Sequence, residues 1–215
     1  MLNLIQMKHK GIYVILIIFL LLTFQNSLFG QTWEFVKEKD GVKIYSRQEP
    51  GRNLKSFKGV TEIKESAEKV FARIEDVNHT EWWDKNLSQI KVLLYEKNKR
   101  AQYHIVYATP WPIKSRDLYA DVTVSINQVT GERKISAIPL IGAPPQSKEF
   151  IRIKDYRQEW TVLPVNNNLT HVELEFYVDP DDKLPEWLLN LVFIESPVNT
   201  IKGLIQQIEK NKNKN

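Results

Sequence analysis

The residue types that most often carry enzyme chemistry are absent or poorly spaced in this 215-residue sequence. It contains no cysteine, which excludes disulfides, thiolate nucleophiles and zinc–thiolate sites. It also lacks both the Gly-x-Ser-x-Gly turn of serine hydrolases and any glycine-rich phosphate loop. His79, Glu81 and Asp84 are close in sequence, but their spacing matches no metal motif. We therefore predict no catalytic residues, no metal and no cofactor.

The most informative charged residue is Arg116, which precedes the segment 118–126. Apolar and polar side chains alternate along that segment, and Arg116 has the parity of the apolar ones. A guanidinium on a buried face requires an acid or a ligand anion as its partner. Two interpretations stay open: a contact to the polar end of a ligand, or a structural ion pair at the start of a strand.

Many strands separated by turn residues are expected to position these groups. The predicted strands are 42–45, 54–63, 90–95, 101–107, 118–126, 133–138, 150–154, 160–163 and 169–178. Clean alternation in 118–126 and 169–178 is typical of an antiparallel sheet with one buried and one solvated face. It assigns His171, Glu173 and Glu175 to the solvated face.

Helices complete the pattern. One follows a cap at Ser66, another is expected from Pro185 to Val192, and a final one is expected to begin at Ser196-Pro197. The final helix carries an apolar stripe that must cover the buried sheet face: Val198, Ile201, Leu204, Ile205 and Ile208. The fold class is therefore α+β, a curved antiparallel sheet wrapped around a long C-terminal helix. Gly203 is expected to let that helix pack closely on the sheet.

The N-terminus is typical of a secretory signal peptide, because Lys8 and Lys10 precede the uncharged apolar run 12–22. We assign residues 1–30 to this signal, 31–210 to one domain and 211–215 to a frayed tail. The protein is thus expected to be exported to the periplasm or the cell exterior, or else anchored by an uncleaved segment. Its net charge is only +4, which does not indicate a nucleic-acid partner.

Four sequence segments, taken in order, resemble the START domain, the lipid-binding family related to steroidogenic acute regulatory protein, here in a secreted bacterial-type form. They are EWWD (81–84), TPWPIKSRDLYADV (109–122), FIRIKDYRQEW (150–160) and VDPDDKLPEWLLN (178–190). The resemblance implies a helix-grip fold that encloses one lipid in a hydrophobic cavity and performs no chemistry on it. It implies a lipid or another hydrophobic small molecule as partner, with transient membrane contact and a monomeric state.

The expected lipid-binding residues come from the cavity-facing strands and the final helix: Tyr107, Arg116, Tyr156, Gln158, Trp160, Ile201, Leu204 and Ile205. Gln158 and Tyr156 match ligand-contacting positions of the phosphatidylcholine-transfer branch. Thr80, Ile105 and Leu118 instead replace that branch's phosphate-binding arginine and two aromatics of its choline cage. A fatty acid, a sterol-like lipid or an isoprenoid therefore fits the sequence as well as phosphatidylcholine. A cyclase- or aromatase-like enzyme and an interaction domain without a cavity remain alternatives.

We expect residues 1–30 to be missing from the exported protein, because the basic head and the short apolar run form a cleavable signal. N-terminal sequencing or intact mass measurement should place the new N-terminus at or near Gln31. Recovery of an intact Met1 in the membrane fraction would support the uncleaved anchor instead.

Overall fold

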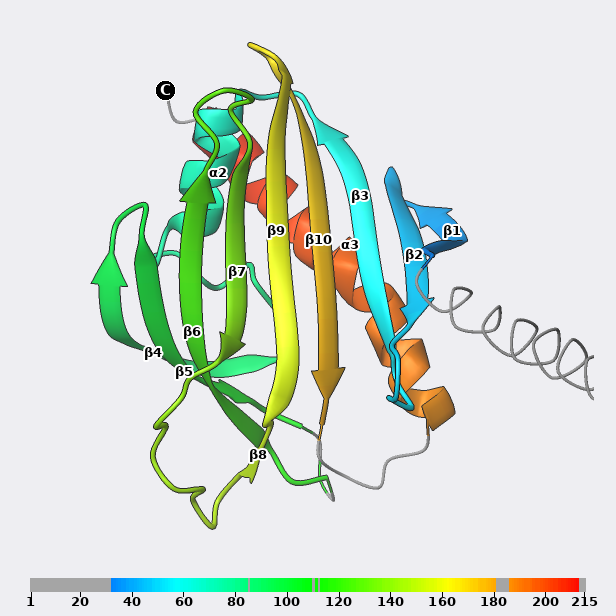
Figure 1. The fold of residues 1–215 in the computed structure, drawn as a ribbon, viewed down its shortest axis with the longest axis vertical. Helices are drawn as coiled ribbons and strands as arrows, with labels where there is room; N and C mark the ends of the chain where they lie inside the picture. The colour runs from blue at the N-terminus through cyan, green and yellow to red at the C-terminus, as the bar shows by residue number, and fades with distance from the viewer. Residues whose placement is uncertain (1–31, 85, 110, 112, 181–185, 213–215) are drawn as a thin grey trace, which may run out of the picture.

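A computed structural model describes residues 32–84, 86–109, 111, 113–180 and 186–212, and the predicted signal segment lies outside them. Two helices lie on the inner side of one long curved sheet (Figure 1). The strands are β1 (Glu34–Lys39), β2 (Val42–Gln48), β3 (Lys55–Ile63), β4 (Leu87–Glu96), β5 (Arg100–Tyr107), β6 (Arg116–Ile126), β7 (Arg133–Pro139), β8 (Ile151–Arg152), β9 (Asp155–Asn166) and β10 (Leu169–Asp179). The helices are α2 (Ala67–Glu75) and α3 (Glu186–Lys212).

The sheet runs in the order β1-β2-β3-β10-β9-β7-β6-β5-β4, and every neighbouring pair is antiparallel. This confirms the predicted α+β helix-grip architecture. In the described part of the chain, no helix is both long enough and apolar enough to cross a membrane.

Three strands differ most from the sequence prediction. Strand β1 was not predicted, because its six residues EFVKEK are mostly charged and exposed. Strand β9 is longer than expected and runs from Asp155 to Asn166. The predicted strand 150–154 shortens to the two residues of β8, which pair in parallel with the start of β6. Sequence alternation is weak at all three places, because the pairing there depends on contacts between distant residues.

The helix expected from Pro185 and the final helix expected from Ser196-Pro197 form one element. Helix α3 starts at Glu186 and continues through Pro197, so the predicted break at Ser196-Pro197 is wrong. A proline inside a helix removes one backbone hydrogen bond, so such a helix needs support from its packing. Pro197 packs directly on Gly59 of β3, where an added Cβ atom would lie only 2.7 Å from the proline Cβ. This close approach offsets the cost of the proline.

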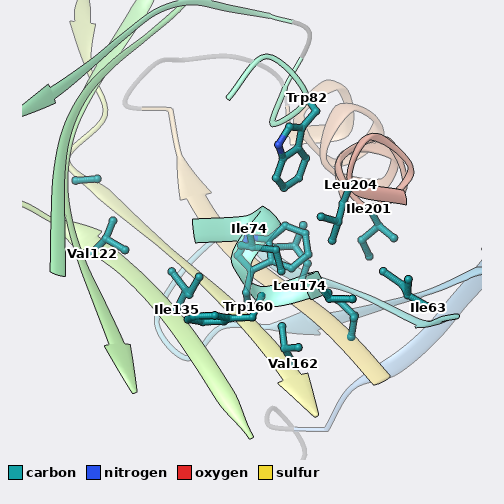
Figure 2. Close-up of a cluster of buried hydrophobic side chains, with 14 of the residues drawn as sticks. Ile63, Ile74, Trp82, Val122, Ile135, Trp160, Val162, Leu174, Ile201 and Leu204 are labelled. Atoms are coloured by element: carbon teal, nitrogen blue, oxygen red, sulfur yellow. The ribbon is translucent and has the colours of Figure 1, made fainter. Parts of the chain in front are cut away.

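The core lies between the inner face of the sheet and the two helices (Figure 2). Helix α3 packs on β2, β3 and β10, whereas α2 packs on β9 and β10. Four residues of the predicted stripe are buried: Val198, Ile201, Leu204 and Ile208. Ile205 is half-buried at the edge of the same cluster. The apolar stripe therefore packs the helix against the core, as the 3.6-residue period of its residues predicts.

The sequence suggested that Gly203 packs on the sheet. In the structure, Gly203 packs instead on the segment between α2 and β4. A Cβ atom at Gly203 would lie 2.6 Å from the backbone carbonyl oxygen of Trp82. Nearby, the Thr200 hydroxyl donates a hydrogen bond of 3.1 Å to the carbonyl oxygen of Trp83. The two tryptophans are thus held against α3 by a close backbone approach and a hydrogen bond.

We predict that Gly203→Ala destabilises the protein by about 1–3 kcal/mol, because the new methyl group overlaps the Trp82 carbonyl oxygen. The direction of this stability change is informative, because replacing a glycine inside a helix with alanine ordinarily stabilises the helix by about 1 kcal/mol. Thermal unfolding measures the change. The matched control is Asn199→Ala on the exposed side of the same helix. A melting temperature that rises equally in both variants would contradict the close packing.

Candidate functional site

The inner face of β9 carries three of the predicted site residues at alternate positions: Tyr156, Gln158 and Trp160. Trp160 is buried in the core, where its ring packs edge-on against Trp82 with 6.3 Å between ring centroids. The intervening residues of the strand point to the opposite face, because side chains alternate along a strand. The single strand β9 thus brings Tyr156 and Gln158, which lie between the predicted strands 150–154 and 160–163, to the same face as Trp160.

Gln158 is exposed even though it lies on the inner face of a central strand. It is paired on one side with Phe176 of β10 and on the other with Ala137 of β7. Its neighbours in the same strand, Tyr156 and Trp160, are both buried. A side chain in this position keeps accessible surface only if nothing packs directly over it. The inner face is therefore open above Gln158.

Tyr107 gives a second polar group on the inner face, at the end of β5. The side chain is half-buried, and burial raises the pKa of its hydroxyl, which therefore stays protonated. Among the described residues, no group forms a side-chain hydrogen bond with either Tyr107 or Gln158. Both can therefore donate to a bound molecule.

The Tyr156 hydroxyl is occupied within the sheet. It lies 2.7 Å from the carbonyl oxygen of Tyr119 and 3.0 Å from that of Ile138, and it donates its proton to this pair. Burial, and secondarily the nearby Tyr107, raises the pKa of this hydroxyl. Only the ring and an oxygen lone pair of Tyr156 remain for contact with a ligand.

The wall formed by β5 and β6 is aliphatic. Ile105 and Leu118 lie directly opposite each other in these strands, and both are buried in the core. Further along β5, Tyr103 packs edge-on against Trp83, with 5.6 Å between ring centroids. The inner surface thus combines apolar walls with a few polar groups, an arrangement that suits a hydrophobic small molecule.

Two of the predicted residues from α3, Ile201 and Leu204, are fully buried. They face the core and hold the helix in place. Ile205 keeps some accessible surface. Ile201 also reaches Gly59, where an added Cβ would lie 2.9 Å from its Cδ1 atom. Of these three residues, Ile205 is the one placed to touch a molecule beside the helix.

Arg116 is buried on the inner face of β6, as its parity predicted. Its guanidinium donates a hydrogen bond of 2.7 Å to the carbonyl oxygen of Lys114. The neighbouring Asp117 lies on the outer face and is also buried. Arg152 of β8 holds Asp117 through two hydrogen bonds of 2.8 and 2.9 Å. His104 approaches the same carboxylate at 3.1 Å.

This buried pair fixes β8 to β6, and sequence reasoning missed it. Asp117 and Arg152 are 35 residues apart, and neither breaks the local pattern of its segment. The available signal was Arg152, an arginine that lies between Ile151 and Ile153. Among the described residues, no cluster of His, Asp or Glu is arranged to hold a metal ion.

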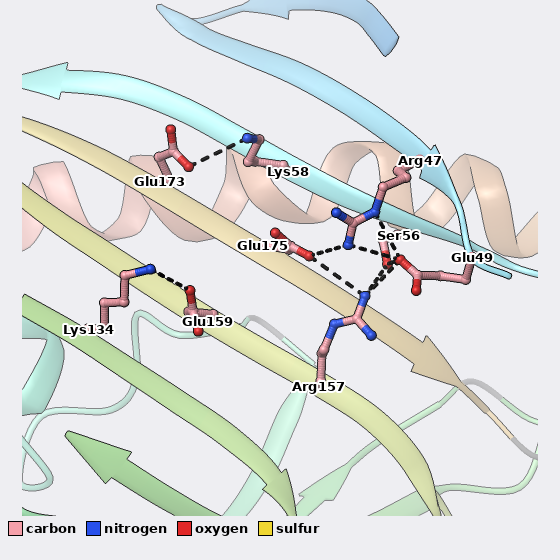
Figure 3. Close-up of polar contacts among 9 residues, drawn as sticks. All are labelled: Arg47, Glu49, Ser56, Lys58, Lys134, Arg157, Glu159, Glu173 and Glu175. Carbon is pink, nitrogen blue, oxygen red and sulfur yellow. Dashed lines mark hydrogen bonds and ion pairs between the residues drawn. The ribbon is translucent and has the colours of Figure 1, made fainter. Parts of the chain in front are cut away.

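The outer face of the sheet carries a network of ion pairs (Figure 3). Glu49 is its buried centre and accepts hydrogen bonds from Ser56 at 2.5 Å, from Arg157 at 2.7 Å and from Arg47 at 3.1 Å. Burial opposes ionisation of this carboxyl, but the hydrogen bonds outweigh that cost and lower the pKa of Glu49. Arg47 also donates to Glu175 at 2.7 Å.

Comparison with known sequences identifies the family. A model of the START domain matches residues 28–214. The chain belongs to the START domain family. It is 31% identical over 182 residues to an uncharacterised protein of Pseudomonas aeruginosa, PA1579, covering 84% of this chain and 89% of that protein. It is 23% identical over 189 residues to the mouse phosphatidylcholine transfer protein, covering 84% and 85% of the two chains.

Solved structures share the fold. A STAR-related lipid transfer protein from Xanthomonas axonopodis superimposes with a TM-score of 0.73 at 24% identity, covering 82% of this START domain protein and 98% of that chain. An aromatase/cyclase from Streptomyces superimposes with a TM-score of 0.52 at 11% identity, covering 72% and 93%. At these identities the structures establish the helix-grip fold alone.

We predict that Glu49→Gln destabilises the protein by about 1–3 kcal/mol at neutral pH, because it weakens charge-assisted hydrogen bonds at a buried position. The pKa of Glu49 is lower in the folded protein than its ordinary value of 4.5. Its contribution is therefore present above pH 4.5 and is lost as the pH falls through the folded pKa.

Urea unfolding of the wild type and the variant should therefore differ at pH 7 and converge in acid. Glu62→Gln, at an exposed position on the same outer face, is the matched control and should change little. A stability difference that stays constant from pH 7 to pH 3 would show that the charge of Glu49 is not the cause.

Proposed function

We propose that this protein binds one lipid, or a similar hydrophobic molecule, between the inner face of the sheet and α3, and that it is not an enzyme. The observation that carries this proposal is the exposed Gln158 on the inner face of a fully paired central strand. Relatives named for lipid transfer support it. Transfer between membranes and export from the cytoplasm belong to the same proposal.

Binding would be driven by desolvation of the lipid tail. Each CH₂ group moved from water to an apolar environment contributes about 0.8 kcal/mol. The aliphatic pair Ile105 and Leu118 and the half-buried Ile205 provide such an environment. Gln158 and Tyr107 would orient the polar end, since a buried hydroxyl or carbonyl needs a hydrogen-bond partner.

We further propose that the lipid has a small or uncharged polar end. A choline group is held by several aromatic faces around its cation. Ile105 and Leu118 occupy two of the positions where such aromatics would lie, and they pair with each other across β5 and β6. Thr80 replaces the arginine that would neutralise a phosphate. A zwitterionic headgroup would therefore be poorly compensated here, although a named relative is a phosphatidylcholine transfer protein.

An enzyme of the cyclase or aromatase kind is less well supported, because such a site needs acid–base residues facing the ligand. In β5, β6, β9 and β10, strand alternation places the histidines and carboxylates on the outer face. Several of them have polar partners there: His171 forms a hydrogen bond with Glu173, and Lys134 forms an ion pair with Glu159. The tyrosines on the inner face have raised pKa values and are weak acids.

The test is mass spectrometry of organic extracts of the purified protein, followed by competition against a fluorescent lipid. We expect a single class of co-purifying lipid, and better competition by fatty acids, sterols or diacylglycerol than by phosphatidylcholine. Gln158→Leu should weaken binding about two- to tenfold, the worth of one hydrogen bond. Gln206→Leu, on the exposed side of α3, is the matched control.

Two outcomes would contradict the proposal. A protein that is free of lipid and does not bind the probe would show that the fold serves another role. Stronger competition by phosphatidylcholine, abolished by Arg116→Ala, would show that Arg116 is a headgroup site and that the expected selectivity is wrong.

A further inference from the structure

Strand β4 forms the edge of the sheet that lies furthest from β1 (Figure 1). It pairs with β5 on one side, and among the described residues no strand pairs with its other side. With ten residues it is longer than β1, the six-residue strand at the opposite edge. A free strand edge presents unpaired backbone N–H and C=O groups, so it can accept another strand.

The edge strand β4 exposes apolar side chains that are close together in sequence. Val92, Leu93 and Tyr95 are 40%, 41% and 40% exposed. The two charged residues of the strand, Lys91 and Glu96, lie on either side of this apolar run. Natural sheets usually protect a free edge with charged residues, as β1 does with four charges in its six residues EFVKEK. The centre of β4 lacks that protection.

A β-bulge interrupts β4 at Leu93. Val92 is opposite Tyr103 of β5, whereas Leu94 is opposite the next residue, Gln102, so Leu93 is an extra residue without a partner of its own. The bulge shifts the alternation of side chains between the two faces by one residue. Two residues that are five positions apart, one on each side of the bulge, therefore share a face, whereas in a regular strand they would point to opposite faces.

The register with β5 assigns these faces. Lys91 and Glu96 are opposite outward-facing residues of β5. Val92 and Tyr95 are opposite two buried residues of its inner face. The strand thus carries a lysine and a glutamate on the outer face, and a valine and a tyrosine on the inner face.

The segment 91–96, KVLLYE, is therefore complementary to itself. When two copies of β4 run antiparallel about a two-fold axis that is perpendicular to the sheet at the middle of this segment, Lys91 of each copy is opposite Glu96 of the other. In the same register, Val92 is opposite Tyr95. Such an axis requires opposed residues to share a face, and the bulge meets that requirement. Opposite charges and aromatic–β-branched pairs across strands both stabilise a sheet.

We propose that two copies of this protein associate through the free edges of β4, which pair antiparallel and continue one sheet across both molecules. The partner is a second copy because the segment matches itself in charge, in side-chain type and in face. The inference concerns a surface outside the lipid site, and it differs from the monomeric state that the family resemblance implies. A bulge often turns an edge strand away from other chains. Here it is the feature that lets the strand pair with its own copy.

The other charges near this edge are compatible with the pairing. The turn after β4 carries Lys97, Lys99 and Arg100. In the proposed register they lie beside residues 87–90 of the other copy, which have no charge. Arg100 is already held by an ion pair within its own chain. A register shifted by one residue would place Lys91 opposite Lys97, so repulsion between like charges favours the proposed register.

Analytical ultracentrifugation over a range of protein concentrations measures the association. Six paired residues from each copy are fewer than the about 20–30 of a standard interface, so we expect a weak dimer with a micromolar dissociation constant. Leu93→Lys should raise that constant at least about tenfold, because it places an unpaired charge at the centre of the pairing. The matched control is Val36→Lys, which changes the bulge residue of the other edge strand at a similar exposure of 38% and should leave the dimer unchanged.

Charge reversal tests the register. Lys91→Glu and Glu96→Lys each place like charges opposite each other at two symmetric positions, so each should weaken the dimer about tenfold. The double variant Lys91→Glu/Glu96→Lys exchanges the two charges and should restore the affinity of the wild type.

The absence of cysteine from the sequence allows the register to be mapped by disulfide formation. Residues directly opposite in an antiparallel pair lie about 4.5–5.5 Å apart, a distance that a disulfide can span. A mixture of Lys91→Cys and Glu96→Cys proteins should therefore form a covalent heterodimer on oxidation. Lys91→Cys alone should not, because its two copies lie about 17 Å apart along the strand.

A wild type that remains a monomer at millimolar concentration overturns the proposal. A dimer that Leu93→Lys leaves intact, or that Val36→Lys dissociates, overturns it as well. The same holds if the double charge reversal fails to restore a dimer that the single variants weaken. Circular dichroism of each variant shows whether the fold is retained. Lipid extraction tests the proposed function separately, because the β4 edge lies outside the lipid site.

Discussion

The close packing of α3 against its neighbours is the constraint on which the rest of the structure depends. Helix α3 covers β2, β3 and β10, and it is held in place at two points where a side chain is missing. Gly59 admits Pro197, and Gly203 admits the carbonyl group of Trp82. With these approaches made, Ile201 and Leu204 are fully buried, and the helix remains continuous despite its proline.

The packing of the helices also explains why part of the inner face remains open. Helix α3 lies close to β2, β3 and β10, and α2 packs on β9 and β10. Trp82 and Trp83 reach over toward Trp160 and Tyr103. The position of Gln158 between β7 and β10 is left uncovered. The open region is therefore a consequence of where the helices are held, and the sheet itself continues through it without a break.

The outer face of the sheet is solvated and carries ion pairs. A sheet with one solvated face must keep that face polar, and here it does so with ion pairs that link neighbouring strands, such as Lys58 with Glu173 and Arg47 with Glu175. Most of these pairs are partly exposed and individually weak. The buried exceptions, Glu49 and Asp117, are held by several hydrogen bonds each and stabilise particular junctions. Charge is thus directed away from the apolar interior.

The sequence by itself determined the fold class, the position of most strands along the chain, and which side chains share a face in the strands with clear alternation. Periodicity is a local property, so the inner parity of Arg116 and the buried stripe of α3 could be read from spacing alone. Gln158 lies between two predicted strands and was singled out by the family resemblance. Contacts between distant residues could not be read in this way. The continuity of the helix through Pro197, the contact of Gly203 with Trp82, and the pairing of Asp117 with Arg152 were decided by tertiary structure. The same holds for the openness of the face at Gln158, since exposure depends on what packs above a residue and parity records only the direction in which it points.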